Sequence, residues 1–254
     1  MNFLVTNDDG ITAPGVKALV EVLSNFGKVY VVCPNAEKSA VSHSITMRQP
    51  ISVDAYNPFH DQVTSWSVSG TPADCVKLAL EVLIKEPIDM VFSGINMGSN
   101  IGRDIFYSGT IHAAMEAQLF HLPAVALSID SYNPQETNFS HCKKWLFEFL
   151  TKLLKQPLNP KVLLNVNFPS VTKEEFKGFK IADLDFTVDR YKHVTFDDTF
   201  GQLVYWLKDH RFSITSDQTD CDFMLIKDGY ATITPIQLSY TNQDLMNQYA
   251  NLLR

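Results

Sequence analysis

Short apolar runs alternate with helical patterns along the first half of this 254-residue chain, and this alternation limits the possible folds more than any other feature. Residues 3–6 and 29–33 are apolar runs of strand length. Between them, Pro14 begins a stretch with apolar residues at helical spacing, and Gly27 is placed to end that helix. Strands that alternate with helices in this way form parallel sheets joined by right-handed crossovers. We therefore expect an α/β fold, a Rossmann-like three-layer sandwich around a mostly parallel sheet.

The same alternation continues after a polar stretch over residues 35–50, which we expect to be a loop. Thr71 followed by Pro72 is typical of the start of a helix. Further strands are expected over residues 88–92, 124–128 and 162–166. Further helices are expected over residues 72–83, from Thr110 onward and over residues 138–155.

The pattern changes beyond Pro169, where short apolar runs are separated by polar turns without helical spacing between them. We expect strands over residues 180–185, 202–207, 223–226 and 231–236, and a helix over 244–253. This predicts an α/β catalytic core over residues 1–170. A β-hairpin-rich extension over residues 171–254 would then serve oligomerisation.

Composition narrows the possible partners and location of the chain. The hydrophobic fraction of 45% excludes global disorder, and a net charge of −7 argues against general nucleic-acid binding. No apolar run approaches the roughly 20 residues that cross a bilayer, and the N-terminus lacks the basic region of a secretory signal. The four cysteines are scattered, as is typical of reduced thiols. We expect a cytoplasmic protein with no stable nucleic-acid or membrane partner.

An acidic pair, Asp8 and Asp9, directly follows the first expected strand. Ligands bind at the carboxyl ends of strands in open α/β sheets, and Ser39 and Asn96 follow other strands of the same sheet. Adjacent carboxylates repel unless a proton or cation lies between them, and hard divalent cations prefer oxygen ligands. These side chains together predict a metal site, although the acidic pair alone is more typical of a solvated turn.

A second candidate feature is Ser108-Gly109-Thr110, at the start of an expected helix. Free N–H groups at a helix start bind phosphate, although an ordinary Ser/Thr cap explains the local sequence as well. The chain has no P-loop, no dinucleotide fingerprint, no Cys/His zinc motif and no nucleophile elbow.

Several longer motifs occur together in one order. They are N-D-D-G at 7–10 with A-P-G at 13–15, S-G-T-P-A-D at 69–74, S-G-I-N-M-G-S-N at 93–100, Y-S-G-T at 107–110, L-N-V-N-F-P at 164–169 and G-Y-A-T-I-T-P at 229–235. This set resembles the SurE (survival protein E) family of 5'/3'-nucleotidases over nearly the whole chain. The resemblance implies a metal-dependent phosphomonoesterase that hydrolyses nucleoside 5'- and 3'-monophosphates to nucleoside and phosphate, with metal-activated water as the nucleophile.

The resemblance also implies roles for individual residues. Asp8 and Asp9 would be catalytic, and with Ser39 and Asn96 they would hold one Mg²⁺ or Mn²⁺ per subunit. The implied phosphate- and substrate-binding residues are Asn7, Gly94, Asn96, Ser108, Gly109 and Thr110. Family members form dimers or tetramers, so a homodimer or homotetramer is expected.

Two segments depart from the family pattern. Ala40 and His43 stand where many members have Gly and Asn, which affects substrate preference, and the turn at 219–222 matches only loosely. The roles of Arg103 and Asp104 are open, a surface salt bridge being one possibility. Two other classes of protein stay open. One is an exopolyphosphatase or broad small-molecule phosphatase that accepts short polyphosphate, and the other is a non-catalytic nucleotide-binding protein.

Overall fold

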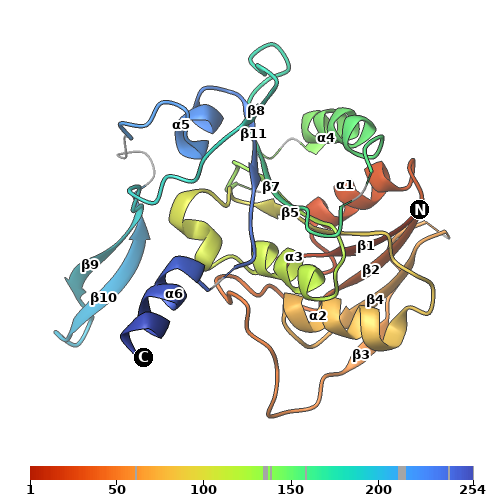
Figure 1. Ribbon diagram of the computed structural model, residues 1–254, viewed down its shortest axis with the longest axis horizontal. Helices are drawn as coiled ribbons and strands as arrows, with labels where there is room; N and C mark the ends of the chain where they lie inside the picture. The colour runs from red at the N-terminus through yellow and green to blue at the C-terminus, as the bar shows by residue number, and fades with distance from the viewer. Residues whose placement is uncertain are drawn as a thin grey trace.

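A nine-stranded sheet forms the centre of the molecule in this computed structural model, which describes residues 1–60, 62–133, 137, 139–157, 159–210, 216–239 and 241–253. The strand order is β3-β4-β2-β1-β5-β6-β7-β11-β8 (Figure 1). The strands are β1 (Asn2–Thr6), β2 (Lys28–Pro34), β3 (Val53–Ala55), β4 (Thr64–Val68), β5 (Met90–Met97), β6 (Ala124–Ile129), β7 (Leu163–Phe168), β8 (Phe179–Ile181) and β11 (Ala231–Pro235). All neighbours from β4 to β7 pair in parallel, whereas β3 and β11 run antiparallel to β4 and β7.

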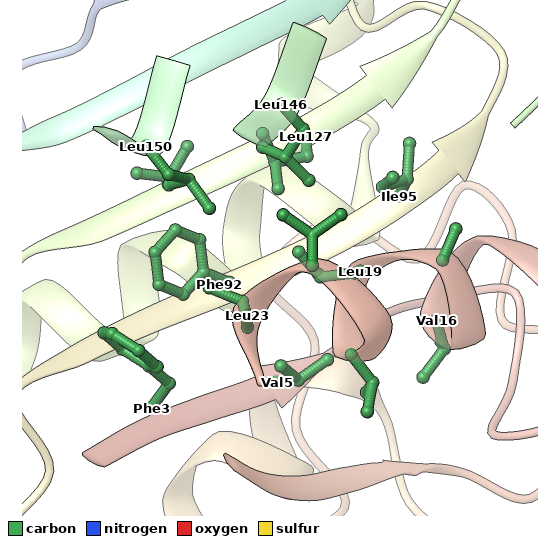
Figure 2. Packing of buried hydrophobic residues seen from close by; sticks show 14 of the residues in the cluster. Phe3, Val5, Val16, Leu19, Leu23, Phe92, Ile95, Leu127, Leu146 and Leu150 are labelled. Atoms are coloured by element: carbon green, nitrogen blue, oxygen red, sulfur yellow. The ribbon is translucent and has the colours of Figure 1, made fainter. Parts of the chain in front are cut away.

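Helices cover both faces of this sheet. They are α1 (Pro14–Leu23), α2 (Pro72–Leu78) with its π-helical continuation η1 (Ala79–Leu83), the 3-10 helix η2 (Gly102–Phe106), α3 (Gly109–Leu119), α4 (Phe139–Leu153), α5 (Asp222–Lys227) and α6 (Gln243–Leu252). Leu19 and Leu23 of α1 and Leu146 of α4 pack with Phe92 in one buried cluster (Figure 2). Residues of α2 and α3 form a second cluster against other strand residues, including Leu4 and Val91. The expected three-layer α/β fold is confirmed.

Strand β1 lies at the point where the strand order changes direction. Its neighbours are β2 on one side and β5 on the other, and both pair with it in parallel. The connection from β1 to β2 contains α1, whereas the connection from β4 to β5 contains α2, which packs in the other cluster. Ligands of open α/β sheets bind in the crevice at such a point, beyond the carboxyl ends of the strands. Asp8 and Asp9 follow the carboxyl end of β1.

Helix starts agree closely with the sequence. Thr71 forms a capping box with Asp74, and Pro72 occupies the first turn of α2. Ser108 caps α3, accepting a hydrogen bond from the Ile111 N–H at 3.2 Å. The loop over residues 35–50 is confirmed.

Gly27 does not end α1, because the helix stops at Leu23. A Cβ atom at Gly27 would lie 2.2 Å from the Met1 carbonyl oxygen, so this residue is small because two backbone segments meet there. The strand expected over 88–92 begins later, at Met90, and continues to Met97. It continues because Gly94 lets β5 approach Leu127 of β6, where a Cβ atom would lie 2.2 Å from the Leu127 carbonyl oxygen.

The strand expected over residues 223–226 is wrong, since this segment is the helix α5. A four-residue apolar run has no period that separates strand from helix. The buried Asp222 carboxylate decides the outcome, because it accepts hydrogen bonds from the N–H groups of Phe223 at 2.8 Å and Gly102 at 2.7 Å. Phe223 and Ile226 then pack together in a small separate cluster.

The chain beyond residue 170 contributes to the main sheet and also projects from it. Strands β8 and β11 complete one edge of the sheet, and the expected strand over 180–185 is shortened to β8. An antiparallel hairpin of β9 (Tyr191–Asp197) and β10 (Leu203–Asp209) extends away from the sheet near α6 (Figure 1). The division near residue 170 and the role of the extension in oligomerisation stay predictions. Among the described residues, no helix has the length and apolar content needed to span a membrane.

Candidate functional site

The carboxylate of Asp8 is held by the first turn of α3. The Thr110 hydroxyl donates to Asp8 Oδ1 at 2.5 Å, and the Thr110 N–H donates to Asp8 Oδ2 at 3.1 Å. A Cβ atom at Gly109 would lie 2.9 Å from both Cβ and Oδ2 of Asp8. Gly109 therefore allows the helix to approach the carboxylate, and Thr110 fixes the direction in which the carboxylate points.

Asp9 is held from the opposite side by the end of β5. The Met97 N–H donates to Asp9 Oδ2 at 3.3 Å, which places Asp9 next to the segment that carries Asn96. The Asn96 side-chain N–H donates to the Gly98 carbonyl at 2.7 Å, so its amide oxygen is the atom suited to a cation. The predicted meeting of the ends of β1 and β5 is thus observed at Asp9.

The loop that follows β2 brings Ser39 to the same edge of the sheet. The Lys38 N–H donates to the Asp8 carbonyl oxygen at 2.7 Å, so the loop lies against the acidic pair. Ser39 is exposed, and its hydroxyl donates to the carboxylate of Glu37. Glu37 was not expected at the site, and its position two residues before Ser39 is the one sequence feature that could have indicated it.

Burial and mutual repulsion define the electrostatics of the acidic pair. Burial raises the pKa of Asp8, and the hydrogen bonds from Thr110 oppose that rise. Burial, with the charge of Asp8 next in importance, raises the pKa of Asp9 to about 7. The charge of Glu37 adds to the rise at both carboxyls. In the described part of the chain, neither aspartate forms an ion pair with a Lys or Arg.

The other residues expected to bind substrate lie around this pair. Ser108 is buried at the start of α3. The N–H and the hydroxyl of Thr110 both donate to Asp8, so neither is free for another ligand. Asn7 is fully buried; its side-chain N–H donates to the Gly10 carbonyl at 3.0 Å, and its Oδ1 has no hydrogen-bond partner among the described residues. Gly94 lies in β5, where its φ of 134° is accessible to glycine.

These residues fit a hard divalent cation. The buried Asp8 and the partly exposed Asp9 are adjacent carboxylates without a cationic partner among the described residues, and the nearby groups are hydroxyl, amide and carboxylate oxygens. No three His, Cys, Asp or Glu side chains of the described ranges form a metal-binding group, so neutral oxygens would have to complete the ligand set. Their roles as ligands stay predictions.

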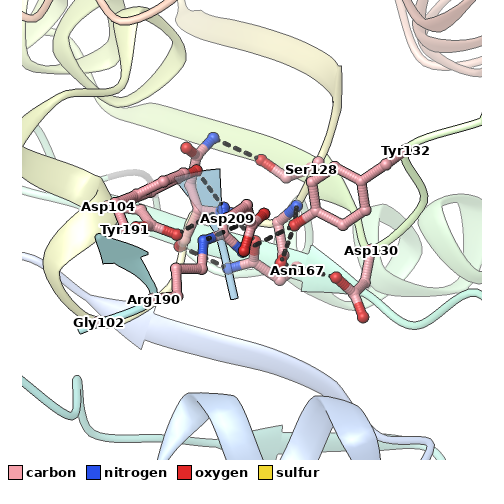
Figure 3. Close-up of polar contacts among 12 residues, drawn as sticks. Gly102, Asp104, Ser128, Asp130, Tyr132, Asn167, Arg190, Tyr191 and Asp209 are labelled. Atoms are coloured by element: carbon pink, nitrogen blue, oxygen red, sulfur yellow. Dashed lines mark hydrogen bonds and ion pairs between the residues drawn. The ribbon is translucent and has the colours of Figure 1, made fainter. Parts of the chain in front are cut away.

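A second polar cluster, which the sequence did not indicate, joins Asp104 of η2 to Arg190 and Tyr132 (Figure 3). Arg190, only 6% exposed, contacts Asp104 Oδ2 at 2.8 Å and donates to the hydroxyls of Tyr132 at 2.9 Å and Tyr191 at 2.7 Å. Asp104 is therefore in a buried ion pair. By contrast, Arg103 forms an exposed pair at 3.4 Å, which is the surface salt bridge considered from the sequence.

Beside this cluster, three asparagines form a buried network. The Asn100 N–H donates to Asn167 Oδ1 at 2.8 Å, and the Asn165 side chain donates to the Asn100 carbonyl at 2.7 Å. The sequence signals were the pair of polar residues inside the apolar strand β7 and the presence of all three asparagines in the motifs at 93–100 and 164–169. The network fixes the backbone shortly after Asn96.

Comparison with known proteins agrees with this architecture. A sequence model of the family described as "Survival protein SurE" matches residues 3–190. A "5'-nucleotidase SurE" from Pelotomaculum thermopropionicum is 38% identical over 100% of this chain and 96% of its own length. One from Trichodesmium erythraeum is 40% identical, covering 95% of this chain and 93% of its own length. The crystal structure of the SurE protein from Aquifex aeolicus superposes with a TM-score of 0.85 at 33% identity, covering 100% of both chains. The chain belongs to the SurE family.

Proposed function

We propose that this chain is a metal-dependent nucleotidase that hydrolyses nucleoside 5'- and 3'-monophosphates to nucleoside and phosphate. The observation that supports this most directly is the Asp8–Asp9 pair at the switch point of the sheet, in which Asp8 is buried and lies next to the N-terminus of α3. Relatives named 5'-nucleotidase SurE, similar over nearly their whole length, support the same activity.

We assign the metal ligands to Asp8, Asp9, Ser39 and Asn96, with Mg²⁺ or Mn²⁺ as the cation and one ion per subunit. When bound, such a cation supplies positive charge that offsets the phosphate and lowers the pKa of water. Thr110 keeps the Asp8 carboxylate in a fixed direction through its two hydrogen bonds. We assign the general base to Asp9, whose partly exposed carboxylate would accept the proton of the attacking water.

The phosphoryl group would lie at the start of α3. The positive end of the helix dipole favours an anion there, beside the Asp8 carboxylate that packs against Gly109. Asn7, Gly94, Asn96, Ser108, Gly109 and Thr110 make up the proposed phosphate-binding surroundings. Because both Thr110 donors engage Asp8, we expect Thr110 to act through that carboxylate before substrate enters.

The location and assembly are part of the same proposal. All four cysteines are free and buried, which suits a reducing cytoplasm. Large apolar side chains on the β9–β10 hairpin and α6 are exposed, including Trp206 at 65% and Leu252 at 76%. We propose that a second copy of the chain covers them in a homodimer or homotetramer.

The test is phosphate release from a panel of nucleoside 5'- and 3'-monophosphates with Mg²⁺, Mn²⁺ or a chelator. We expect metal-dependent release by the wild-type protein, and loss of at least about 100-fold for Asp8→Asn, because a neutral amide is a poorer ligand for a hard cation. Circular dichroism would establish that this variant is folded. Wild-type rates from Asp8→Asn would contradict the metal assignment.

The same panel includes short polyphosphates and non-nucleotide phosphomonoesters. Faster release from these compounds than from nucleotides would favour the polyphosphatase or broad phosphatase. Nucleotide binding without release under every metal condition would favour a non-catalytic binding protein.

A further inference from the structure

The loop over residues 35–50 carries Ser39 and crosses the start of α3. Ala40 and Ser42 have φ angles of 53° and 52°, in the left-handed region that costs non-glycine residues roughly 1 kcal/mol or more each. A loop with this backbone needs contacts outside itself to keep one conformation. Those contacts decide where Ser39 lies relative to Asp8.

Backbone hydrogen bonds fasten the loop on both sides of Ser39. The Lys38 N–H donates to the Asp8 carbonyl at 2.7 Å, and the Thr46 N–H donates to both Asp74 carboxylate oxygens at 3.1 Å. Between these points, the Ser42 N–H donates to the Tyr107 carbonyl at 3.0 Å. The loop is thus attached near Asp8, at the start of α2 and just before α3.

A side-chain hydrogen bond joins the loop to the body of α3. His43 Nε2 lies 2.8 Å from Glu116 Oε2, and because a carboxylate only accepts, the imidazole N–H donates. The Glu116 side chain is only 9% exposed, which distinguishes this contact from an ordinary surface pair. The ring of His112, from the same helix, lies 5.3 Å from the His43 ring and packs against it.

The contact therefore reaches the same helix that orients Asp8. His112 Nδ1 lies 2.8 Å from the Ser108 carbonyl, and Thr110, which holds the Asp8 carboxylate, lies six residues before Glu116 in α3. Glu116 anchors His43, and His43 lies four residues after Ser39. A rigid α3 thus sets the positions of both Asp8 and the loop.

We propose that the His43–Glu116 contact is a clasp that positions the Ser39 loop over the Asp8–Asp9 site. His43 and Glu116 are positioning residues, not groups that touch the phosphate. The clasp itself is a property of the loop, whereas its consequence for metal affinity rests on the function proposed above.

Matched variants separate the hydrogen bond from the bulk of the side chain. His43→Leu and Glu116→Leu remove the contact, whereas His43→Gln keeps an N–H donor near the position of Nε2. Amide hydrogen exchange over residues 38–46, measured without metal, reports the loop directly. We expect about tenfold faster exchange in both leucine variants, because each loses one charge-assisted hydrogen bond. Exchange in His43→Gln should stay close to that of the wild type.

Calorimetric titration with Mn²⁺ and steady-state kinetics measure the consequence at the site. We expect the leucine variants to bind Mn²⁺ about tenfold more weakly, with kcat at saturating metal changed by less than about threefold. Glu148→Leu is the control, since it removes a helix glutamate from the exposed Lys152 pair in α4. It should leave exchange over 38–46 and metal affinity unchanged.

Unchanged exchange over 38–46 in His43→Leu and Glu116→Leu would overturn the clasp. Faster exchange with unchanged Mn²⁺ affinity would overturn its link to the metal site. If the wild-type protein bound no Mn²⁺ and hydrolysed no nucleotide, the proposed function would be wrong. The exchange measurement would still test whether the His43–Glu116 contact holds the loop.

Discussion

Asp9 links the charge of the site to the stability of the protein. Its pKa is about 7 in the folded chain against 3.8 for an unperturbed group, so the folded state keeps a proton that the unfolded state releases. The free energy of unfolding therefore falls as pH rises from about 4 to 7, the window between the two values. Without metal, the acidic pair destabilises the fold at neutral pH.

Asp9→Asn should remove this pH dependence. With a chelator present at pH 8, we expect the free energy of unfolding of the variant to exceed that of the wild type by about 1–3 kcal/mol. This range is smaller than the full pKa difference would give, because Asp9 is partly exposed and solvent screens its charge. The difference should shrink towards pH 4, where the wild-type carboxyl is largely protonated in both states. Urea unfolding across this pH range is the measurement, and parallel pH curves for the two proteins would contradict the expectation.

Gly109 offers a second test at the scale of one residue. Gly109→Ala places a methyl group 2.9 Å from Asp8 Cβ and Oδ2, so the carboxylate or the helix must move. We expect phosphatase activity to fall about 10- to 100-fold, with a loss of unfolding free energy of about 1–3 kcal/mol. Gly178→Ala is the control for activity alone: nothing lies within 4 Å of its added Cβ, but the φ of 100° at Gly178 strains an alanine and would lower stability. Equal activity in the two variants would show that Asp8 tolerates the shift.

The sequence predicted which strand ends meet at the candidate site, but not the side chains that hold the surrounding segments in place. Asp8, Asp9 and Asn96 were expected together because parallel strands end at a common edge, and the Met97–Asp9 hydrogen bond bears this out for β1 and β5. Partners such as Glu116 and Arg190 were missed, because contacts between residues far apart in the chain leave no local pattern.

At the scale of elements, sequence prediction succeeded where length or caps gave a clear signal. Helix α2 has a capping box and α3 a serine cap, and both starts were placed correctly. Helix α5 was missed because its N-cap, Cys221, makes no side-chain capping hydrogen bond, and the partners of its first residue, Asp222, include Gly102 from a distant segment. The hairpin strand β9 was also missed, since most of its residues are exposed and no apolar alternation marks it.

Arg190 joins several elements, so its removal should weaken all of them together. It connects the base of the β9–β10 hairpin with η2 and with the segment after β6. Arg190→Leu leaves the Asp104 carboxylate buried without its cation, and we expect a loss of about 3–5 kcal/mol of unfolding free energy. Arg190→Lys should recover only part of this, because an ammonium lacks the planar fork that reaches both tyrosines.

The matched control is Arg103→Leu, which breaks the exposed pair with Asp189. An exposed pair contributes less than about 1 kcal/mol, so urea unfolding should separate the two arginines clearly. Similar losses from both variants would mean that the buried cluster does not hold these elements together.

At the scale of the whole molecule, the uneven distribution of apolar surface is the main feature. The sheet and its helices bury their large side chains, whereas α6 has no buried residue and the β9–β10 hairpin exposes Tyr205 and Trp206 by about two thirds. A ten-residue helix is marginal in water without packing, and contiguous exposed apolar surface is typical of interfaces. These surfaces therefore support the proposed assembly of identical subunits.

Placing a charge on the hairpin should separate the subunits without unfolding them. We expect the wild-type protein to sediment as a dimer or tetramer and Trp206→Asp to shift towards monomer, since an unpaired carboxylate is costly to bury at an interface. Leu119→Asp is the control, because Leu119 is 56% exposed at the end of α3, outside the extension. Sedimentation velocity over a range of concentrations measures the shift, and circular dichroism checks the fold. A monomeric wild-type protein would contradict the proposed assembly. An unchanged assembly in Trp206→Asp, with dissociation in Leu119→Asp, would place the interface elsewhere.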